Sequence, residues 1–517
     1  MGGCAAKPSE DPRHSVRPPS LRQVRVVPTR PLHTEQLKEV QDGGFGKAQF
    51  ILDKPGRIQD VYDMESKKLG EGSYGSVSKG VHKSTAVVRA VKTIAKTKVK
   101  HIERFKKEIA IMKIMDHPNI IKLFETFEDH HNIYLAMELC SGGELFDRIV
   151  EASHFREKEA AIIMQQILRA IFYLHEQRIC HRDLNGTVAA FLFQSKDPIE
   201  GNVLKLIDFG LSAKFKDGEP MSSRAGTPYY VSPQVLAGKY NHLCDLWSAG
   251  VIMYILLCGT PPFFGNNDQE VLAKVKYGNL TFNPREWSGV SQDAKDLVRM
   301  LVKMNPSERL NAEQALNHSW IKNRAPRATN APLPTNFVPR LRKFRCRSKF
   351  SKAVLHVIAS QLNEFQIKSL RETFLALDNN GDGLLSLTEL KEGLSQAGIT
   401  DLPEDLKEIM EGIDSDGSGV IDYTEFLAAT IEKRQYIQED VCWTAFRVFD
   451  LNGDGKITPN EMRMVLNNGN VNSLVDVQAT ADVLKEVDKN GDGAIDFKEF
   501  MTMMRNMSKS MSMDAIP

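Results

Sequence analysis

The chain divides at residues 340–362, which read RLRKFRCRSKFSKAVLHVIASQL. Seven Lys and Arg side chains, and no Asp or Glu, occur between Arg340 and Lys352. A basic amphipathic helix is typical of a membrane-surface segment or of a target for a calmodulin-like groove. A solvated, positively charged surface helix is the alternative, so the flanking sequence has to decide between these interpretations. The apolar residues that recur at roughly helical spacing are Phe344, Phe350, Val354, Leu355, Val357, Ile358 and Leu362.

Length and composition describe a multidomain protein. At 517 residues the chain exceeds one hydrophobic core, and we expect about three domains. The longest apolar run, residues 251–258, is too short to span a bilayer, and no apolar signal segment follows Met1. The seven cysteines form no CxxC pair, which suits free thiols in a reducing compartment. These features predict a cytoplasmic protein.

The net charge of +1 hides a division of charge along the chain. Residues 361–507 carry 28 acidic and 13 basic side chains, a net charge of −15, so the other residues carry +16. Opposite charges on two parts of one chain predict that the parts meet or prefer partners of opposite sign. The simpler interpretation is that metal-binding carboxylates account for the acidity. The chain has no basic array with interleaved aromatic residues, so the sequence does not favour nucleic acid as a partner.

Residues 1–60 are rich in Pro, Arg, Gly and Ser with little periodicity, which predicts a disordered tail. The start, MGGCAAK, places Gly2 for N-myristoylation and Cys4 for palmitoylation, although Ala6 stands where the usual pattern has Ser or Thr. Two acyl chains would anchor the protein stably to a membrane, whereas one would bind only marginally. Acylation with membrane contact and an unmodified flexible tail are both open at this point.

A glycine-rich motif follows the tail. Residues 69–77, LGEGSYGSV, let a strand–turn–strand unit fold over phosphates, although plain hairpins use the same glycine spacing. The later sequence favours phosphates, because Lys92 ends a strand pattern and Glu108 lies in a helical pattern from which it can position that lysine. We expect ATP to contact Leu69, Gly70, Glu71, Gly72, Ser73, Tyr74, Gly75, Ser76, Val77, Ala90 and Lys92.

Two further motifs supply carboxylates. Residues 181–184 read HRDL and residues 208–210 read DFG, which match protein kinase motifs. In kinases the first Asp accepts the proton of the substrate hydroxyl and the second holds Mg²⁺, so Asp183 and Asp208 are the candidates here. Such transfer needs positioning and charge neutralisation more than covalent chemistry. Thr227, in a GTPYY element, is expected to hydrogen-bond Asp183.

The order of these motifs over residues 62–322 resembles a protein kinase domain. The resemblance implies that Glu138 and Cys140 offer backbone hydrogen bonds to adenine, and that Glu144 contacts the ribose or a basic substrate residue. The implied catalytic residues are Lys92, Glu108, Asp183 and Asp208.

The chain departs from the kinase pattern at three places. NGTVAA, residues 185–190, stands where kinases have KPEN and is two residues longer, so the Lys that touches the γ-phosphate is replaced by Asn185 or lost. Ala190 stands where an Asn binds a second Mg²⁺, and Gln234 stands where a Glu pairs with Arg309. Losing one such electrostatic group typically costs about 10²–10³ in rate. A slow kinase, a pseudokinase that binds nucleotide, and an error in the sequence are three explanations.

Four acidic loops follow residue 361. They span residues 378–389, 414–425, 450–461 and 488–499, at spacings of 36 to 38 residues. Each has Asp at the first position, Gly at the sixth and Glu at the twelfth, which fits a Ca²⁺ ion that needs six to eight oxygens. The alternative, acidic turns in helical hairpins, does not explain four complete ligand sets. The predicted ligands are Asp378, Asn380, Asp382, Leu384, Glu389, Asp414, Asp416, Ser418, Val420, Glu425, Asp450, Asn452, Asp454, Lys456, Glu461, Asp488, Asn490, Asp492, Ala494 and Glu499.

Kinase domain, basic connector and four EF-hands together resemble the calcium-dependent protein kinases of plants and protists. The resemblance implies an α+β fold, with a bilobal kinase followed by an all-α two-lobed EF-hand domain. The expected segments are a tail at 1–60, a kinase domain at 62–322, a junction at 323–362, a calmodulin-like domain at 363–507 and a tail at 508–517.

The implied function is calcium-activated transfer of the ATP γ-phosphate to Ser and Thr hydroxyls of protein substrates, with ATP, Mg²⁺ and Ca²⁺ as cofactors. Without Ca²⁺ the junction helix would block the kinase cleft, and with Ca²⁺ the EF-hand lobes would grip it. The alternative is a catalytically impaired pseudokinase that acts as a calcium-responsive binding or scaffold protein.

Overall fold

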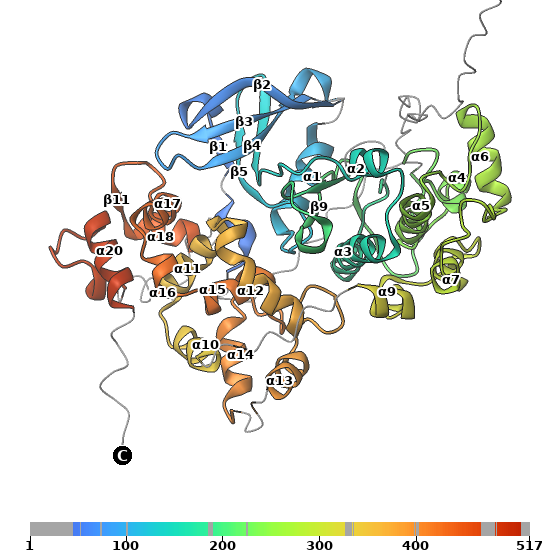
Figure 1. The fold of residues 1–517 in the computed structure, drawn as a ribbon. Helices are drawn as coiled ribbons and strands as arrows, with labels where there is room; N and C mark the ends of the chain where they lie inside the picture. Colours follow the sequence, from blue (N-terminus) through green and yellow to red (C-terminus); the bar gives the residue numbers. More distant parts are fainter. Residues whose placement is uncertain are drawn as a thin grey trace, which may run out of the picture.

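The computed structural model describes residues 45–51, 53–72, 75–99, 102–184, 190–223, 226–325, 333, 336–397, 399, 403–466, 481 and 483–507. A sheet-containing lobe and a helical lobe form the kinase domain, and a second helical region packs beside them (Figure 1). The α+β fold class predicted from the sequence is therefore confirmed. Gly2, Cys4, Ser73, Tyr74 and residues 185–189 lie outside the described residues.

The first lobe is built on a six-stranded sheet with the order β1-β5-β6-β4-β3-β2. Neighbouring strands are antiparallel except β1 and β5, which are parallel. Helix α1 (Ile102–Ile114) belongs to this lobe and carries Glu108. The strands are β1 (Asp53–Pro55), β2 (Tyr62–Gly72), β3 (Gly75–His82), β4 (Val88–Ala95), β5 (Leu123–Glu128) and β6 (Asn132–Met137).

The second lobe is helical and is organised around α5 (Cys244–Cys258). Every residue of α5 from Cys244 to Leu257 is buried, as expected for a helix that is apolar on all sides. Helix α3 (Glu157–Glu176) packs against α5, α8 and α9. The other elements are α2 (Leu145–Ala152), β7 (Ile179–Cys180), β8 (Phe191–Phe193), β9 (Leu204–Leu206), β10 (Ala213–Lys214), α4 (Pro233–Ala237), α6 (Asp268–Tyr277), α7 (Gln292–Leu301), α8 (Ala312–Leu316) and α9 (Ser319–Arg324).

The basic stretch forms two helices, α10 (Phe337–Arg345) and α11 (Lys349–Gln361), where the sequence predicted one. The break is local, because the Ser348 side chain accepts a hydrogen bond from Ser351 N–H and so begins a new helix. Nine residues of α11 are buried, including Val354, Leu355 and Ile358. The predicted apolar face therefore packs into a core instead of facing solvent.

The EF-hand helices surround α11. Helices α15 and α17, which belong to different EF-hand pairs, both contact α11, while α10 contacts α14 and α15. Loops 1 and 2 are joined by backbone hydrogen bonds between Leu385 and Ile421, and loops 3 and 4 by the pairing of Ile457 with Ile495. The elements are α12 (Glu364–Leu377), α13 (Leu387–Gln396), α14 (Leu406–Ile413), α15 (Tyr423–Thr430), α16 (Lys433–Tyr436), α17 (Glu439–Phe449), β11 (Lys456–Ile457), α18 (Pro459–Leu466), β12 (Ile495–Asp496) and α20 (Phe497–Asn506).

The cationic side chains of α10 meet the acidic EF-hand region, as the division of charge predicts. Arg340 pairs with Glu432 at 3.1 Å, and Arg342 pairs with Asp405 at 2.7 Å. Arg345 contacts Asp405 at 3.2 Å. These pairs are partly exposed, so each contributes little to stability. They orient the connector, while burial of its apolar face supplies most of the energy.

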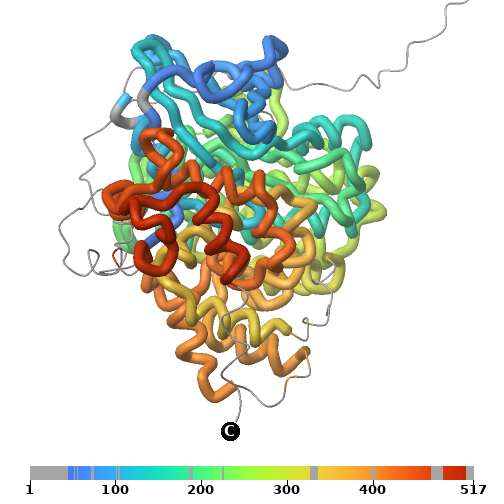
Figure 2. The backbone as a smooth tube through the Cα atoms, turned by 90° about the vertical axis from the view of Figure 1, so that its left-hand side faces the viewer, coloured from blue at the N-terminus to red at the C-terminus, as the bar shows by residue number. Residues whose placement is uncertain are grey.

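The EF-hand region lies against the side of the kinase domain, with its last helices beneath the sheet-containing lobe (Figure 2). Across the interface, Asp116 accepts hydrogen bonds from Thr424 N–H at 2.7 Å and from Thr424 Oγ1 at 2.8 Å. Arg89 Nη2 donates to Gln361 Oε1 at 2.7 Å, and Lys122 Nζ to Ser360 O at 3.3 Å. The sheet lobe therefore holds the C-terminal end of α11 directly.

Part of the predicted N-terminal tail is structured, which corrects the sequence-based boundary at residue 60. Residues 47–50 form a 3-10 helix, η1 (Lys47–Phe50), and β1 joins the sheet through β5. Phe45 and Phe50 are buried in the core of the EF-hand region, and Ile51 is buried in that of the kinase domain. The sequence did not reveal this because these apolar residues show no periodicity that predicts a helix or strand.

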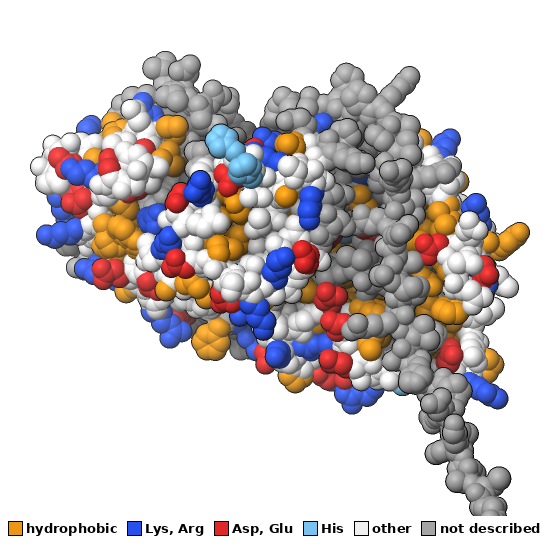
Figure 3. All heavy atoms as spheres, turned by 90° about the horizontal axis from the view of Figure 1, so that it is seen from above, with side chains coloured by type: hydrophobic (Ala, Val, Ile, Leu, Met, Phe, Trp, Pro, Cys, Tyr) orange, Lys and Arg blue, Asp and Glu red, His pale blue; other side chains and the backbone are white. Residues whose placement is uncertain are grey.

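Helix length and surface charge describe the exterior of the protein. Among the described residues, no helix combines the length and the apolar character needed to cross a bilayer. The face seen from above in Figure 3 shows Lys and Arg side chains interspersed with Asp and Glu. Charges of both signs are therefore mixed on this face.

The burial of α11 yields a stability prediction. We expect Ile358→Ala to lower the free energy of unfolding of the EF-hand region by about 3 kcal/mol, because the fully buried side chain leaves a cavity. Phe365→Ala, on α12, removes a larger side chain that is 91% exposed. This control should change the free energy of unfolding by no more than about 0.5 kcal/mol. Urea unfolding of each variant, with Trp247, Trp287 and Trp320 replaced by Phe in the parent and in both variants so that Trp443 alone reports, measures the change. Equal effects would contradict the assignment of α11 to the core.

Candidate active site and calcium loops

The glycine-rich loop forms the hairpin of β2 and β3. Leu69, Gly70 and Glu71 lie on β2, Ser76 and Val77 lie on β3, and Gly72 pairs with Gly75 at the turn end. A Cβ at Gly75 would lie 1.8 Å from the backbone oxygen of Thr93, so a side chain cannot fit there. A Cβ at Gly70 would meet nothing within 4 Å, so this glycine leaves open space. At Gly70 the hairpin thus offers bare backbone, which suits the close approach of phosphates.

Lys92 lies within electrostatic range of Asp208. Lys92 lies on β4, paired with Val77 and Leu135, while Asp208 begins the DFG motif. Burial alone would raise the pKa of Asp208, but the charge of Lys92 and the Gly210 N–H, at 3.1 Å, hold it below the usual value. Asp208 is therefore an anion, the form that binds Mg²⁺.

Glu108 lies close to the same motif. Its carboxylate oxygens approach Gly210, at 3.6 and 3.8 Å from the position that a Cβ would take there. The pairing of Glu108 with Lys92 stays a prediction. A Cβ at Gly210 would lie 3.2 Å from Asp208 Oδ1, a tight contact, and at ordinary van der Waals distance from Glu108.

The catalytic loop is held by a buried aspartate. Asp245 Oδ2 accepts from His181 N–H at 2.9 Å and contacts His175 Nε2 at 2.9 Å, while Oδ1 accepts from Arg182 N–H at 2.8 Å. Burial raises the pKa of Asp245, but these donors outweigh it and hold the pKa at about 2. Arg182 has a φ of +69°, a strained conformation that these bonds maintain. Asp183 then accepts from Thr227 Oγ1 at 3.2 Å, as predicted.

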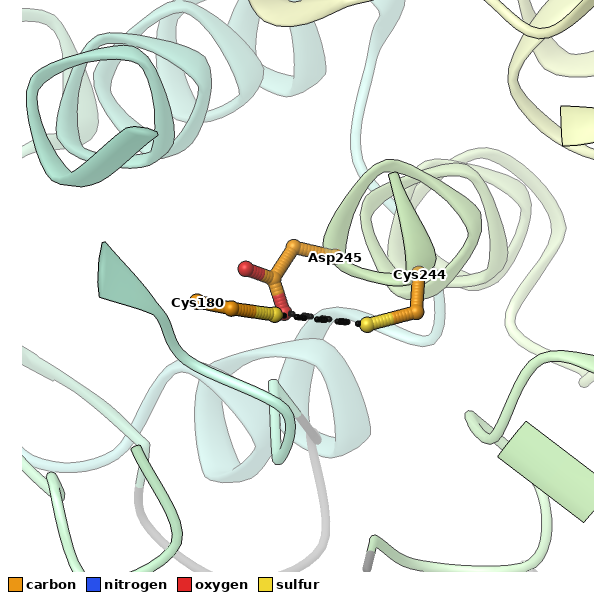
Figure 4. Close-up of side chains that lie close together, drawn as sticks. All are labelled: Cys180, Cys244 and Asp245. Carbon is orange, nitrogen blue, oxygen red and sulfur yellow. Dashed lines mark hydrogen bonds between the residues drawn. The ribbon is translucent and has the colours of Figure 1, made fainter. Parts of the chain in front are cut away.

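Two cysteines lie beside this aspartate (Figure 4). Cys180 Sγ and Cys244 Sγ are 3.4 Å apart, and Cys244 Sγ lies 3.9 Å from Asp245 Oδ1. Burial raises the pKa of Cys180 well above the usual value, so it stays a neutral thiol. Because both oxygens of Asp245 hold the backbone of the catalytic loop, we assign this cluster a structural role.

The departures from the kinase pattern have visible consequences. Ala190 is 2% exposed, and its carbonyl accepts from Ile207 N–H at 2.9 Å, so a methyl group lies next to the strand that leads to DFG. It offers no side-chain oxygen to a second Mg²⁺. Arg309 is buried and donates to Gln234 Oε1 at 3.0 Å. Burial lowers the pKa of Arg309 to about 10, and the neutral amide of Gln234 provides no opposing charge.

The hinge residues follow β6. Glu138 pairs through its carboxylate with Lys205 at 3.0 Å, and burial raises the pKa of Cys140 to about 12. Glu144 is half-buried just before α2, where burial and then Asp147 raise its pKa. Ala90 is buried on β4 opposite Met137. The adenine contacts of Glu138 and Cys140 and the ribose or substrate contact of Glu144 stay predictions.

Each calcium loop uses its two terminal carboxylates in the same way. The Asp at position one accepts hydrogen bonds from the backbone N–H groups of the glycines at positions four and six, for example Asp414 from Gly417 at 2.9 Å and Gly419 at 2.8 Å. The Glu at position twelve accepts backbone N–H groups from positions near both ends of the loop, as Glu425 does from Ser415 and Asp422. The four loops therefore share one conformation.

Carboxylate crowding in these loops fits a divalent cation. In loop 2, oxygens of Asp414, Asp416 and Glu425 lie within 4.8 Å of one another. Burial, followed by the charge of Asp416, raises the pKa of Glu425 well above its usual value. In loop 1, burial raises the pKa of Asp378 to about 7, although Arg169 opposes the shift. Because Ca²⁺ would remove this repulsion and takes oxygen ligands, the donor sets fit it.

Comparison with known proteins agrees with this geometry. A protein kinase domain model matches residues 64–321, and an EF-hand domain pair model matches residues 367–431 and 439–505. Calcium-dependent protein kinase 3 of Plasmodium berghei (strain Anka) is 44% identical over 89% of this chain and 83% of its own. Calcium-dependent protein kinase 5 of Plasmodium falciparum (isolate 3D7) is 43% identical over 89% and 81%, and calcium-dependent protein kinase 34 of Arabidopsis thaliana is 39% identical over 88% and 86%.

The chain belongs to the calcium-dependent protein kinase family. The family resemblance stated from the motifs is therefore confirmed.

Sequence reasoning missed two residues that matter in this member of the family. Asp245 lies in the CDLW stretch, and only the fold shows that it accepts hydrogen bonds from the catalytic loop. Nothing in the DHPNI stretch indicates that Asp116 joins the kinase domain to the second calcium loop. The sequence signal that points to Asp116 is an acidic residue between two apolar segments, in the stretch IMKIMDHPNII.

The loop geometry yields a calcium-binding prediction for this kinase. We expect Glu425→Gln to weaken Ca²⁺ binding at loop 2 by about tenfold or more, because a bidentate anionic ligand becomes a neutral amide. Calorimetric titration of the full chain should show three unchanged sites and one weakened site. Glu411→Gln, an exposed change on α14, should leave all sites unchanged, and a loss of affinity in that control would point to a non-specific charge effect.

Proposed function

We propose that this chain transfers the γ-phosphate of ATP to Ser and Thr hydroxyls of protein substrates under the control of Ca²⁺. The observation that carries the proposal is the burial of the connector α11 between helices of both EF-hand pairs, while the EF-hand region docks on an assembled kinase domain. A calcium-dependent change in the EF-hands would act directly on the connector and, through the docked interface, on the kinase domain.

The proposed division of roles follows the geometry of the cleft. Asp183 would accept the proton of the substrate hydroxyl. Thr227 donates a hydrogen bond to its carboxylate, and Asp245 holds the backbone of the preceding residue, Arg182. Lys92 would hold the phosphates beneath the bare hairpin of β2 and β3. Mg²⁺, bound at Asp208, would neutralise charge on the transferred group. Glu144, a half-buried carboxylate just before α2, would favour a basic residue in the substrate.

The connector is proposed to regulate access to the cleft. In this structure α10 and α11 lie within the EF-hand region, which is the arrangement expected when the EF-hands grip the connector. Without Ca²⁺, we propose that the same cationic segment covers the kinase cleft and inhibits the enzyme. To move such an equilibrium from 1:99 to 99:1, calcium has to favour the open state by about 5.5 kcal/mol, which four sites can supply together.

The methyl group of Ala190 favours a second candidate, a pseudokinase that binds nucleotide and signals by its shape. One metal-binding carboxylate, Asp208, is in place, whereas residue 190 provides no second ligand. We therefore expect turnover to be slow in comparison with a kinase that has both ligands. Acylation at Gly2 and Cys4 is a further proposal, and would add membrane contact to either candidate.

Phosphate transfer to a basic peptide, measured with Ca²⁺ and with a chelator, separates the two candidates. We expect transfer that calcium stimulates, and a rate at least about 10² lower for Asp183→Asn, because the proton acceptor is lost. The Asp183→Asn variant should still bind ATP, which shows that it is folded. Nucleotide binding by the parent chain without any transfer in calcium would establish the pseudokinase instead.

A further inference from the structure

Seven residues upstream of the matched kinase domain contact both halves of the protein. Residues 45–51 lie beside α11 as a short blue segment in Figure 1. Phe45 is 3% exposed, and both Phe45 and Phe50 belong to the core that contains α11. Ile51 belongs to the kinase core, together with Ile94 and Phe105. This segment, which we call the N-terminal wedge, therefore joins two hydrophobic cores.

The wedge contacts the second calcium loop and the connector. Phe45 N–H donates to Ser415 O at 2.8 Å, and Ser415 is the second residue of that loop. The ring of Phe45 packs edge-on against His356 of α11 at 5.1 Å, and Phe50 lies 6.4 Å from Phe449 of α17. One short peptide thus meets an EF-hand loop, the connector and a helix of the second EF-hand pair.

A buried ion pair ties the wedge to the kinase domain. Lys47 Nζ lies 3.1 Å from Asp116 Oδ1 and also donates to the backbone oxygen of Met115. The side chains of Lys47 and Asp116 are 9% and 3% exposed. Asp116 also accepts from Thr424, the residue before the twelfth-position ligand Glu425. Asp116 is therefore shared by the wedge and by the second calcium loop.

This sharing makes the three parts interdependent. A buried carboxylate without a counter-charge is strongly unfavourable. The charges of Lys47, which pairs with Asp116 directly, and of Lys122 offset this cost while Asp116 binds Thr424. Phe45 in turn needs the backbone carbonyl of Ser415 in its present place, which depends on the conformation of the loop. The wedge can bind fully only when the second calcium loop is docked on the kinase domain.

We propose that residues 45–51 form a built-in docking peptide, which closes over the junction of the kinase domain and the second calcium loop when that loop holds Ca²⁺. The contacts of the wedge are made by an aromatic residue, Phe45, a lysine two positions later, Lys47, and a second aromatic residue, Phe50. The wedge stabilises the docked arrangement, and calcium at loop 2 stabilises the wedge. This role is independent of whether the enzyme transfers phosphate.

Hydrogen–deuterium exchange on the full chain tests the proposal without any measurement of activity. We expect the amides of the wedge to exchange at least tenfold more slowly in saturating Ca²⁺ than in chelator. Lys47→Met should remove most of that calcium-dependent protection, at the wedge and at Thr424. Lys83→Met changes an exposed lysine at the same lobe and should leave both rates as in the parent.

A compensating variant separates the ion pair from general damage to the fold. Lys47→Met combined with Asp116→Asn removes both members of the ion pair and keeps an amide oxygen as an acceptor for Thr424, so protection should return at least in part. Equal exchange of the wedge in calcium and in chelator would overturn the proposal. The proposal also fails if Lys47→Met behaves like Lys83→Met, or if the double variant is no better protected than the single one.

Discussion

The arrangement of this protein depends on the burial of one amphipathic helix, α11. Its apolar side chains enter the core that both EF-hand pairs share, and its C-terminal end is held by Arg89 and Lys122 of the sheet lobe. Transfer of this much apolar surface from water outweighs the weak, partly exposed ion pairs of α10. The charged residues of α10 therefore orient the connector, while the apolar residues of α11 supply most of the free energy that binds it.

The interface beside α11 is polar and buried, which makes it specific. Asp116 is placed between Lys47 and Thr424, so a kinase residue, an upstream residue and a calcium-loop residue depend on one another. Buried polar groups are tolerated only when their partners are in place. A conformational change in the second calcium loop should therefore break the hydrogen bonds between Thr424 and Asp116 of the kinase domain.

The catalytic lobe shows how a fold can survive departures from its family pattern. The backbone of the catalytic loop is still held by Asp245, and Asp208 is still an anion beside Lys92. Where Gln234 replaces an acidic partner, Arg309 keeps a hydrogen bond at 3.0 Å and loses only the opposing charge. The losses thus affect the electrostatics of phosphate transfer more than the architecture that positions it.

The sequence by itself determined the kinase motifs, the four calcium loops, the helical connector and the complementary charges of the two regions, because each depends on local spacing or composition. It did not determine that Ser348 divides the connector into two helices, or that the wedge from Phe45 to Ile51 is folded. Nor did it reveal Asp116 as the meeting point of three segments. Those features depend on contacts between residues far apart in the chain, and only the packing of the kinase domain on the EF-hand region brings such residues together.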